Sequence, residues 1–530
     1  MRDLHQPGRS VAMGQRGAAA TSHPLSTTIA IETMRQGGNA VDAAVTACIL
    51  QSVLEPHNTG LGGDCFALVW KARERRLFAL NGSGPAPQGL SDQWLLSQGI
   101  NNIGTEDVHS VTIPGALDAW QRLLADHGTL NLDSAFEPAI DYAERGFVLA
   151  ERAAADWAAE ATKLGRDAGG RAHFLRPDGS APRAGDVVRL PALARTMRRV
   201  AQEGADGFYR GDIASTLVTT LNAMGGRHSR ADFADYASHY VEPLRSNYRG
   251  VELVQLPPSG HGLTALVMLN ILARFDHRGL DPAGADRFHL QAEAARLAYR
   301  VRDTFVADPA YADVPVAELL SDRFADTLAA RIRLDRALPD DFALPALAQR
   351  DTVYVTVVDG EGNACSLISS LFFAFGSGRV CPQTGIALHN RGAGFRVQPG
   401  HPNSVQPGKR PLHTIIPAMA MRGGQPLLCF GVMGGPYQPV GVVHVLQNMV
   451  DFGMDVQQAL DAPRGFRYTG AFEAERGINE SVVQELARRG HPVERATVPL
   501  GGGQVIEIDQ ATGVLRAGSD PRKDGSALAY

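Results

Sequence analysis

The 530-residue sequence has few cysteines, no long apolar run and little charge imbalance, and each shortage excludes a class of protein. Its five cysteines show no C-x-x-C spacing, so no structural zinc site is predicted, and such a sparse set is typical of reduced, buried thiols. No stretch approaches the roughly 18 apolar residues of a membrane span, and the N-terminal residues contain no apolar segment typical of a signal peptide. We therefore expect a soluble, cytoplasmic protein without a membrane partner.

Charge and motifs exclude further functions. Lysine and arginine number 51 and aspartate and glutamate 56, giving a formal net charge of −5, which argues against a nucleic-acid partner. There is no phosphate-binding loop and no dinucleotide fingerprint. Neither a G-x-S-x-G elbow nor an H-E-x-x-H helix occurs, so a serine-triad hydrolase and a metal site are disfavoured. The sequence predicts an enzyme without a cofactor or metal, or a binding protein.

Hydrophobic patterning alternates between helical and strand-like segments. Ser26 is expected to cap a helix that ends before Gly37, and a second, apolar helix is expected at Ala40–Leu54. The middle of the chain is mostly helical. Strands are predicted at Val251–Gln255, Val353–Val358, Ala364–Phe373, Gly385–His389, Pro426–Val432 and Gln504–Ile508. This mixture indicates an α+β protein in which helices cover a sheet.

Thr352 stands directly before a predicted strand. If the chain is cut before it, the freed α-amine lies on the same residue as the hydroxyl and can act as its base. An α-amine has a pKa of about 7.7–8.0, so no second base is needed. Taken alone, a threonine at a strand start is usually structural. Gly434-Gly435, which follows another predicted strand, offers backbone N–H groups for an oxyanion or simply forms a turn.

Several motifs taken together resemble one family. Gly37–Ala44, Thr59–Asp64, Asp351–Asp359, Val432–Pro436 and Ser519–Arg522 are similar, in the same order along the chain, to signatures of the γ-glutamyltransferase family. The resemblance implies an αββα sandwich of the N-terminal-nucleophile hydrolase class, whose proenzyme cleaves itself before a threonine.

The resemblance assigns roles to particular residues. The cut would fall between Asp351 and Thr352, giving a large subunit, 1–351, and a small subunit, 352–530, that stay together as a heterodimer and can pair again as a dimer of heterodimers. Thr352 would attack an amide carbonyl, Ser370 would hydrogen-bond the nucleophile, and Gly434 and Gly435 would form the oxyanion hole.

Departures from the family pattern concern the substrate. Relatives that act on γ-glutamyl compounds hold the α-carboxylate with an arginine where this chain has Ser83, and the α-amine with an acidic residue where it has Gly394. Losing one charge-assisted contact costs about 1.5–3 kcal/mol, so both losses together would weaken binding about 10²–10⁴-fold.

Other residues near these motifs suit a small carboxylate. Arg391, His413, Thr414 and Tyr437 are the predicted substrate-binding residues, although Arg391 could instead pair with a surface carboxylate and His413 could be a buried histidine satisfied by the backbone. This pattern resembles the branch of the family that includes oxamate amidohydrolase. The leading hypothesis is an amidohydrolase acting on a small acidic amide such as oxamate. A γ-glutamyl hydrolase or transferase acting on glutathione, a dicarboxylic acylase and an inactive binding protein are the alternatives.

Overall fold

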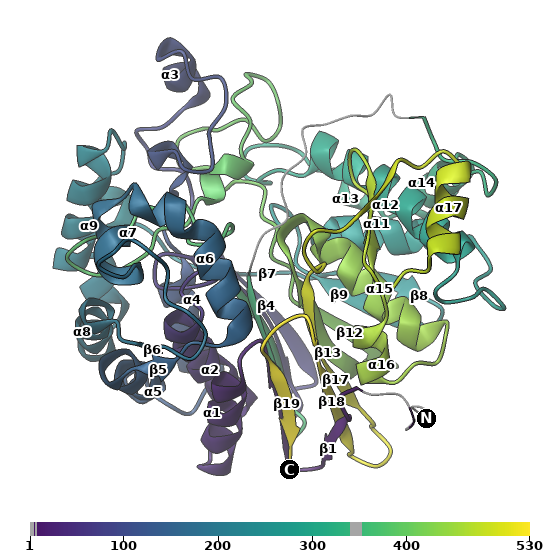
Figure 1. Ribbon diagram of the computed structural model, residues 1–530, viewed down its shortest axis with the longest axis horizontal. Coiled ribbons are helices and arrows are strands. Elements are labelled where there is room, and N and C mark those ends of the chain that lie inside the picture. Colours follow the sequence, from purple (N-terminus) through teal and green to yellow (C-terminus); the bar gives the residue numbers. More distant parts are fainter. Residues whose placement is uncertain (1–4, 6–7, 340–351) are drawn as a thin grey trace.

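The computed structural model describes residues 5, 8–339 and 352–530, which form two stacked sheets between two layers of helices (Figure 1). One sheet orders its seven strands as β19 (Ser526–Ala529), β2 (Gly17–Thr21), β10 (Val353–Asp359), β11 (Ala364–Ser370), β3 (Asp64–Lys71), β4 (Arg76–Gly82) and β7 (His239–Val241). The other orders seven as β1 (Ala12–Gly14), β18 (Leu515–Ser519), β17 (Gly502–Ile508), β13 (Gln425–Met433), β12 (Ala418–Arg422), β9 (Val251–Gln255) and β8 (Leu244–Tyr248). Both are antiparallel, which confirms the predicted αββα sandwich.

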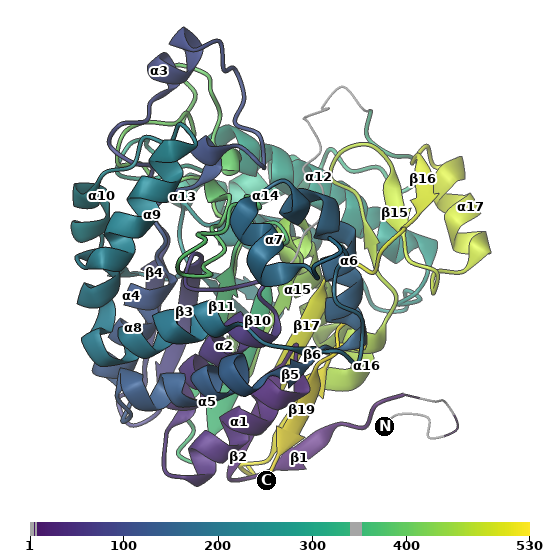
Figure 2. The ribbon, with the colours of Figure 1, turned by 60° about the vertical axis from the view of Figure 1, so that its left-hand side comes forward.

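Helices from the first half of the chain cover the outer face of the β10 sheet (Figure 2). They are α1 (Pro24–Arg35), α2 (Ala40–Leu54), α4 (Ala116–His127), α5 (Leu132–Arg145), α6 (Glu151–Gly165), α7 (Ala168–Phe174), α8 (Pro191–Tyr209) and α9 (Asp212–Ala223). The β13 sheet is covered by α11 (Gly262–Leu272), α12 (Ala285–Phe305), α14 (Asp322–Ala329), α15 (Gln438–Val450) and α16 (Val456–Asp461). Short elements complete the chain: α3 (Asp92–Ser97), α10 (Arg230–Ala234), α13 (Val316–Leu319), α17 (Glu480–Arg488), β5 (Phe147–Val148), β6 (Val187–Val188), β14 (Gly465–Phe466), β15 (Phe472–Ala474) and β16 (Val493–Arg495).

Three apolar layers hold the sandwich together. One lies between each sheet and its helices, and the third lies between the sheets, where Phe66, Tyr354 and Ile368 meet Met419 and Cys429. α2 is buried along its whole length, which explains why its sequence is apolar on every face. Each sheet contains strands from before and after Thr352, so the two predicted subunits share both sheets.

Two local predictions are wrong. The first helix begins at Pro24, and His23 is its N-cap instead of Ser26, because the His23 ring nitrogen accepts the Leu25 N–H. The segment 385–389 is not a strand: Gly385 has a φ of 72°, and the segment makes only isolated bridges.

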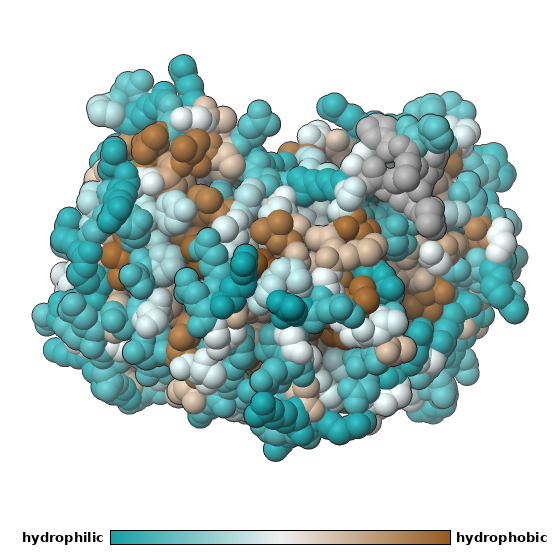
Figure 3. Space-filling model, turned by 90° about the horizontal axis from the view of Figure 1, so that it is seen from below, coloured by the Kyte–Doolittle hydropathy of each residue, from teal (hydrophilic) through white to brown (hydrophobic). Residues whose placement is uncertain are grey.

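Apolar side chains on one face of the surface are scattered, and the cysteines are buried, as the composition predicted for the thiols. On the face shown in Figure 3, apolar side chains occur in small groups among hydrophilic ones. Each of the five cysteines, all in the described part of the chain, is buried and free. None of the described helices has the length and apolar character needed to cross a membrane.

Candidate active site

Thr352 and Ser370 lie side by side at one end of two paired strands. Thr352 immediately precedes β10, Ser370 is the last residue of β11, and the two strands pair antiparallel with Val353 opposite Ser369. The two hydroxyl oxygens are 3.1 Å apart, and both residues are fully buried. The Ser370 hydroxyl also accepts the Phe372 N–H at 2.8 Å, which leaves its own proton free to bond to Thr352. Asp351, the other side of the predicted cleavage site, lies outside the described residues.

The predicted oxyanion glycines follow the end of β13, which packs against β10. Thr356 donates to the carbonyl of Cys429, and the Tyr354 ring covers Gly431. Two residues back along β10 thus correspond to two residues forward along β13, and the same progression brings Thr352 level with Met433, immediately before Gly434.

Both glycines have positive φ angles, which residues with side chains rarely adopt. Gly434 has a φ of 128° and Gly435 a φ of 52°. A Cβ on Gly434 would stand only 2.9 Å from the Gly501 Cα. The following residues turn at once into the short helix Gly435–Tyr437, in which the Tyr437 N–H bonds to the Gly434 carbonyl.

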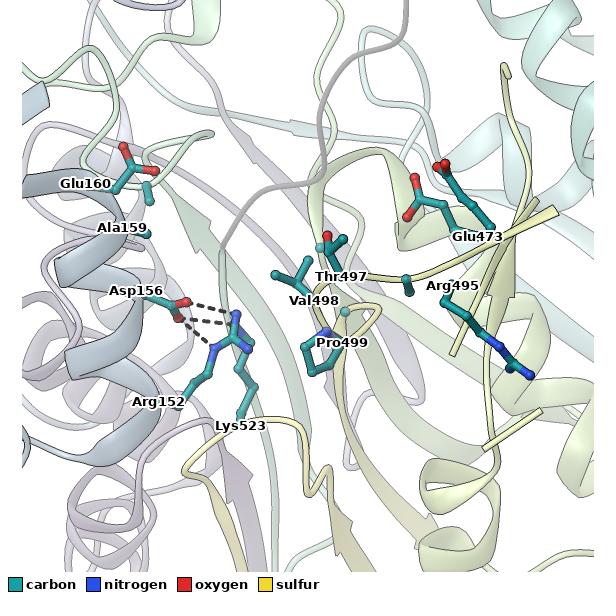
Figure 4. A pocket seen from close by; sticks show the side chains of 15 residues that line it. Arg152, Asp156, Ala159, Glu160, Glu473, Arg495, Thr497, Val498, Pro499 and Lys523 are labelled. Carbon is teal, nitrogen blue, oxygen red and sulfur yellow. Dashed lines mark hydrogen bonds and ion pairs between the residues drawn. The ribbon is translucent and has the colours of Figure 1, made fainter. Parts of the chain in front are cut away.

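A cavity of about 550 Å³ opens beside Gly434 (Figure 4). On one wall Arg152 and Asp156 of α6 form an ion pair at 2.8 Å, and Lys523 lies 3.9 Å from the same carboxylate. Glu473 and Arg495 belong to the opposite wall. The volume is within the range of pockets that bind small organic molecules, and its charged lining favours polar ones.

A buried charged cluster lies across the sheet from Ser370. The partner of Ser370 on β3 is Asp64, whose carboxylate lies 2.9 Å from His413 Nε2, 3.4 Å from His389 Nδ1 and 3.9 Å from Arg391 Nε. Burial raises the pKa of Asp64, but its histidine neighbours lower it more, and the net result is a pKa well below the usual range. Asp64 therefore stays ionised.

His413 is fully engaged within the protein. Burial lowers its pKa to about 3, so the ring is neutral. Its Nε2 carries the proton donated to Asp64, and its Nδ1 accepts the Ile415 N–H at 3.4 Å. The ring is buried, as in the alternative interpretation, but Asp64 as well as the backbone satisfies it. This arrangement indicates that His413 holds the Asp64 carboxylate in place.

Arg391 has unused donors. Its Nη1 donates to Thr414 Oγ1 at 2.8 Å, its guanidinium lies 4.0 Å from the centre of the Phe372 ring, and its Nε and Nη2 have no hydrogen-bond partner. Burial lowers its pKa to about 9, while Asp64 opposes the shift, so Arg391 is charged at neutral pH. A buried cation with free N–H groups is a suitable anchor for a carboxylate.

The structure separates Tyr437 from this cluster. Its side chain is buried, with its ring 5.5 Å from the Phe466 ring and next to Gly501. The predicted substrate-binding residues thus divide into Arg391, His413 and Thr414, which lie together, and Tyr437, whose described contacts are elsewhere.

Ser83 and Gly394, which replace the arginine and the acidic residue of γ-glutamyl-binding relatives, are both uncharged. The Ser83 N–H and hydroxyl both bond to Asn81 Oδ1, and its carbonyl accepts from Arg410 Nε at 3.1 Å. The Gly394 carbonyl accepts from Asn403 at 2.7 Å.

Sequence reasoning did not assign a role to Asp64 or His389. Asp64 ended a quoted signature and His389 ended an expected strand, but their partners are far away in the sequence. One signal in the sequence could have pointed to Asp64: it is an acidic residue directly after two glycines and at the start of a buried strand.

Comparisons with known proteins agree with this geometry. The family described as Gamma-glutamyltranspeptidase matches residues 26–530. The glutathione hydrolase-like YwrD proenzyme of Bacillus subtilis is 34% identical over 97% of this chain and 99% of its own length. The oxamate amidohydrolase proenzyme of Klebsiella pneumoniae is 31% identical over 97% and 98%. The crystal structure of cephalosporin acylase from Bacillus halodurans superposes with a TM-score of 0.93 at 37% identity, covering 100% of this chain and 98% of that one. The chain therefore belongs to the gamma-glutamyltranspeptidase family of N-terminal-nucleophile hydrolases.

Proposed function

We propose that the protein cleaves itself between Asp351 and Thr352 and then hydrolyses amides of small dicarboxylic acids, of which oxamate is the smallest. The observation that carries the substrate class is Arg391, a buried cation with two unpartnered donor nitrogens. It is linked to the nucleophile by a short series of contacts: Arg391 lies over the Phe372 ring, and the Phe372 N–H bonds to Ser370, which contacts Thr352. A carboxylate at Arg391 thus belongs to a short acyl group.

The chemistry follows from Thr352. Its Oγ attacks the amide carbonyl carbon while the α-amine takes the hydroxyl proton. N–H groups of Gly434 and Gly435 would stabilise the negative charge on the carbonyl oxygen. The C–N bond then breaks, the amine leaves with the proton, and water hydrolyses the ester to release the acid and restore Thr352.

A second candidate is an acylase that releases a larger amine from a longer dicarboxylic acyl group. The cavity of about 550 Å³ beside Gly434 supports this alternative, because it gives room for a large group next to the predicted oxyanion glycines. The similarity to a cephalosporin acylase also supports it.

Two experiments test the proposal. Intact-mass analysis should find 1–351 and 352–530 in the wild type and a single chain in Thr352→Ala. Ammonia release from oxamate should then be compared with turnover of glutaryl-p-nitroanilide and γ-glutamyl-p-nitroanilide, which differ only in the α-amine. We expect oxamate to be cleaved, and the glutaryl compound to be preferred over the γ-glutamyl one. An uncleaved, inactive wild type would overturn the nucleophile, and a preference for the γ-glutamyl compound would overturn the substrate class.

A further inference from the structure

One buried tyrosine from the first part of the chain holds the loop that carries the oxyanion glycines. Tyr299 lies on α12 and is fully buried. Its hydroxyl donates a hydrogen bond to the carbonyl oxygen of Pro436, the residue directly after Gly434-Gly435. A side chain on one side of the predicted cut therefore bonds to the catalytic loop on the other side.

The rest of the loop is held by Gly501, which packs against it, and by a hydrogen bond inside the turn. A Cβ on Gly434 would lie 2.9 Å from the Gly501 Cα, and a Cβ on Gly501 would lie 2.6 Å from the Met433 carbonyl oxygen. The Tyr437 N–H closes the turn onto the Gly434 carbonyl. These contacts fix where the loop sits. The hydrogen bond from Tyr299 reaches the Gly435 N–H through two planar peptides. The Pro436 carbonyl shares its peptide plane with the Tyr437 N–H, and the Gly434 carbonyl that accepts this N–H shares its plane with the Gly435 N–H.

The Tyr299 ring is itself fixed by a buried stack. It lies 4.7 Å from the Tyr468 ring, and the Arg302 guanidinium is 4.6 Å from the Tyr299 ring centre and 4.7 Å from that of Tyr468. Arg302 and the Tyr468 hydroxyl both bond to Asp303, at 2.7 and 2.6 Å. The hydroxyl of Tyr299 therefore has little freedom to leave Pro436.

We propose that Tyr299 is a positioning residue of the oxyanion hole: its hydroxyl, acting through the Pro436 carbonyl, orients the Gly435 N–H of the Gly434-Gly435 pair. The proposal rests on the assignment of these glycines in the proposed function. It adds that the first part of the chain supplies a group needed for acyl transfer after the cut.

The closing experiment uses Tyr299→Phe and, as a matched control, Tyr468→Phe. Both remove one hydroxyl from the same aromatic stack, but Tyr468 bonds to Arg302 and Asp303 and not to the loop. The assay is the burst of nitrophenolate when p-nitrophenyl acetate acylates the processed enzyme. This ester has no carboxylate and does not require Arg391, so the assay is independent of the proposed acyl specificity.

We expect Tyr299→Phe to lower the acylation rate constant about 10–100-fold with a change in apparent ester affinity of less than about threefold, since a misplaced oxyanion donor acts on the transition state. Tyr468→Phe should retain the burst rate within about threefold. Equal rates in both variants and the wild type, or equal losses in both, would overturn the role of Tyr299. If the wild type showed no burst, or if Thr352→Ala retained it, the proposed nucleophile would be overturned, and this inference with it.

Discussion

Replacing Arg391 by methionine tests the substrate assignment most directly. The side chain is buried, and methionine keeps much of its length and its packing on the Phe372 ring while removing the charge and the donors. In the unliganded protein the change also removes the hydrogen bond to Thr414 and the loose pairing with Asp64. Lysine at the same position keeps the charge but not the planar fork of donors.

The magnitude follows from the free donors. A charge-assisted hydrogen bond to a carboxylate is worth about 1.5–3 kcal/mol, so losing one should reduce kcat/KM for oxamate or the glutaryl anilide about 10–150-fold. Because neither Nε nor Nη2 has a hydrogen-bond partner, a bidentate contact would place the loss at the upper end. The lysine variant should recover part of the activity.

The assay compares these substrates with p-nitrophenyl acetate, which lacks the carboxylate. Arg391→Met should leave the acetate burst within about threefold of the wild type, and its KM for the carboxylate substrates should rise. If activity toward the ester and the carboxylate amides fell by the same factor, Arg391 would support the fold of the site and not bind the substrate.

Three further predictions concern charge and pH. Because the pKa of Arg391 is about 9, kcat/KM for carboxylate substrates should fall as the pH rises through that value, while the ester reaction shows no such decline; parallel pH profiles would contradict this. Asp64→Asn removes the group that raises the Arg391 pKa, so the same decline should move to lower pH, and an unmoved profile would exclude the coupling. Burial raises the pKa of Glu55 to about 7, although Ser22 and Gln51 donate to its carboxylate. This pKa is above that of an unfolded glutamate, so its stabilisation is complete at low pH and is lost as the pH rises from about 4.5 to 7, a change of about 3 kcal/mol. Thermal unfolding of Glu55→Gln between pH 5 and 8 should lack this dependence; an identical slope in the wild type would refute it.

Local sequence patterns predicted the mixture of helices and strands, and the family resemblance supplied the two-sheet sandwich. The limits of α2 and β9 were predicted to the residue, because a continuous apolar run flanked by turn residues has few alternative structures. The error at 385–389 has the opposite cause. That segment is apolar because it is buried, but its partners are loops, and no local pattern distinguishes a buried loop from a buried strand.

The site was only partly predictable. The contact between Thr352 and Ser370 follows from two adjacent strands of one hairpin. Arg391 and Thr414, both predicted substrate-binding residues, are hydrogen-bonded to each other. Asp64 joins this group from about 300 residues away, through the pairing of β3 with β11. Sequence spacing carries no information on such a contact, and hence none on which donors of Arg391 remain free.

The absence of an acidic group at Gly394 gives the last prediction. In the family members that act on γ-glutamyl compounds, an acidic residue at this position holds the α-amine of the substrate. Gly394→Asp should therefore increase the preference for γ-glutamyl over glutaryl anilide. The Gly394 φ is not in the left-handed region, but a new Cβ would lie 2.9 Å from the Leu412 carbonyl, so the backbone must shift slightly. That shift reduces the gain from a full charge-assisted contact to about tenfold in the ratio of kcat/KM values. Gly394→Asn is the control, because it introduces the same bulk without the charge. An equal change of the ratio in both variants would mean that shape and not charge selects the acyl group, and the assignment of the headgroup position would fail.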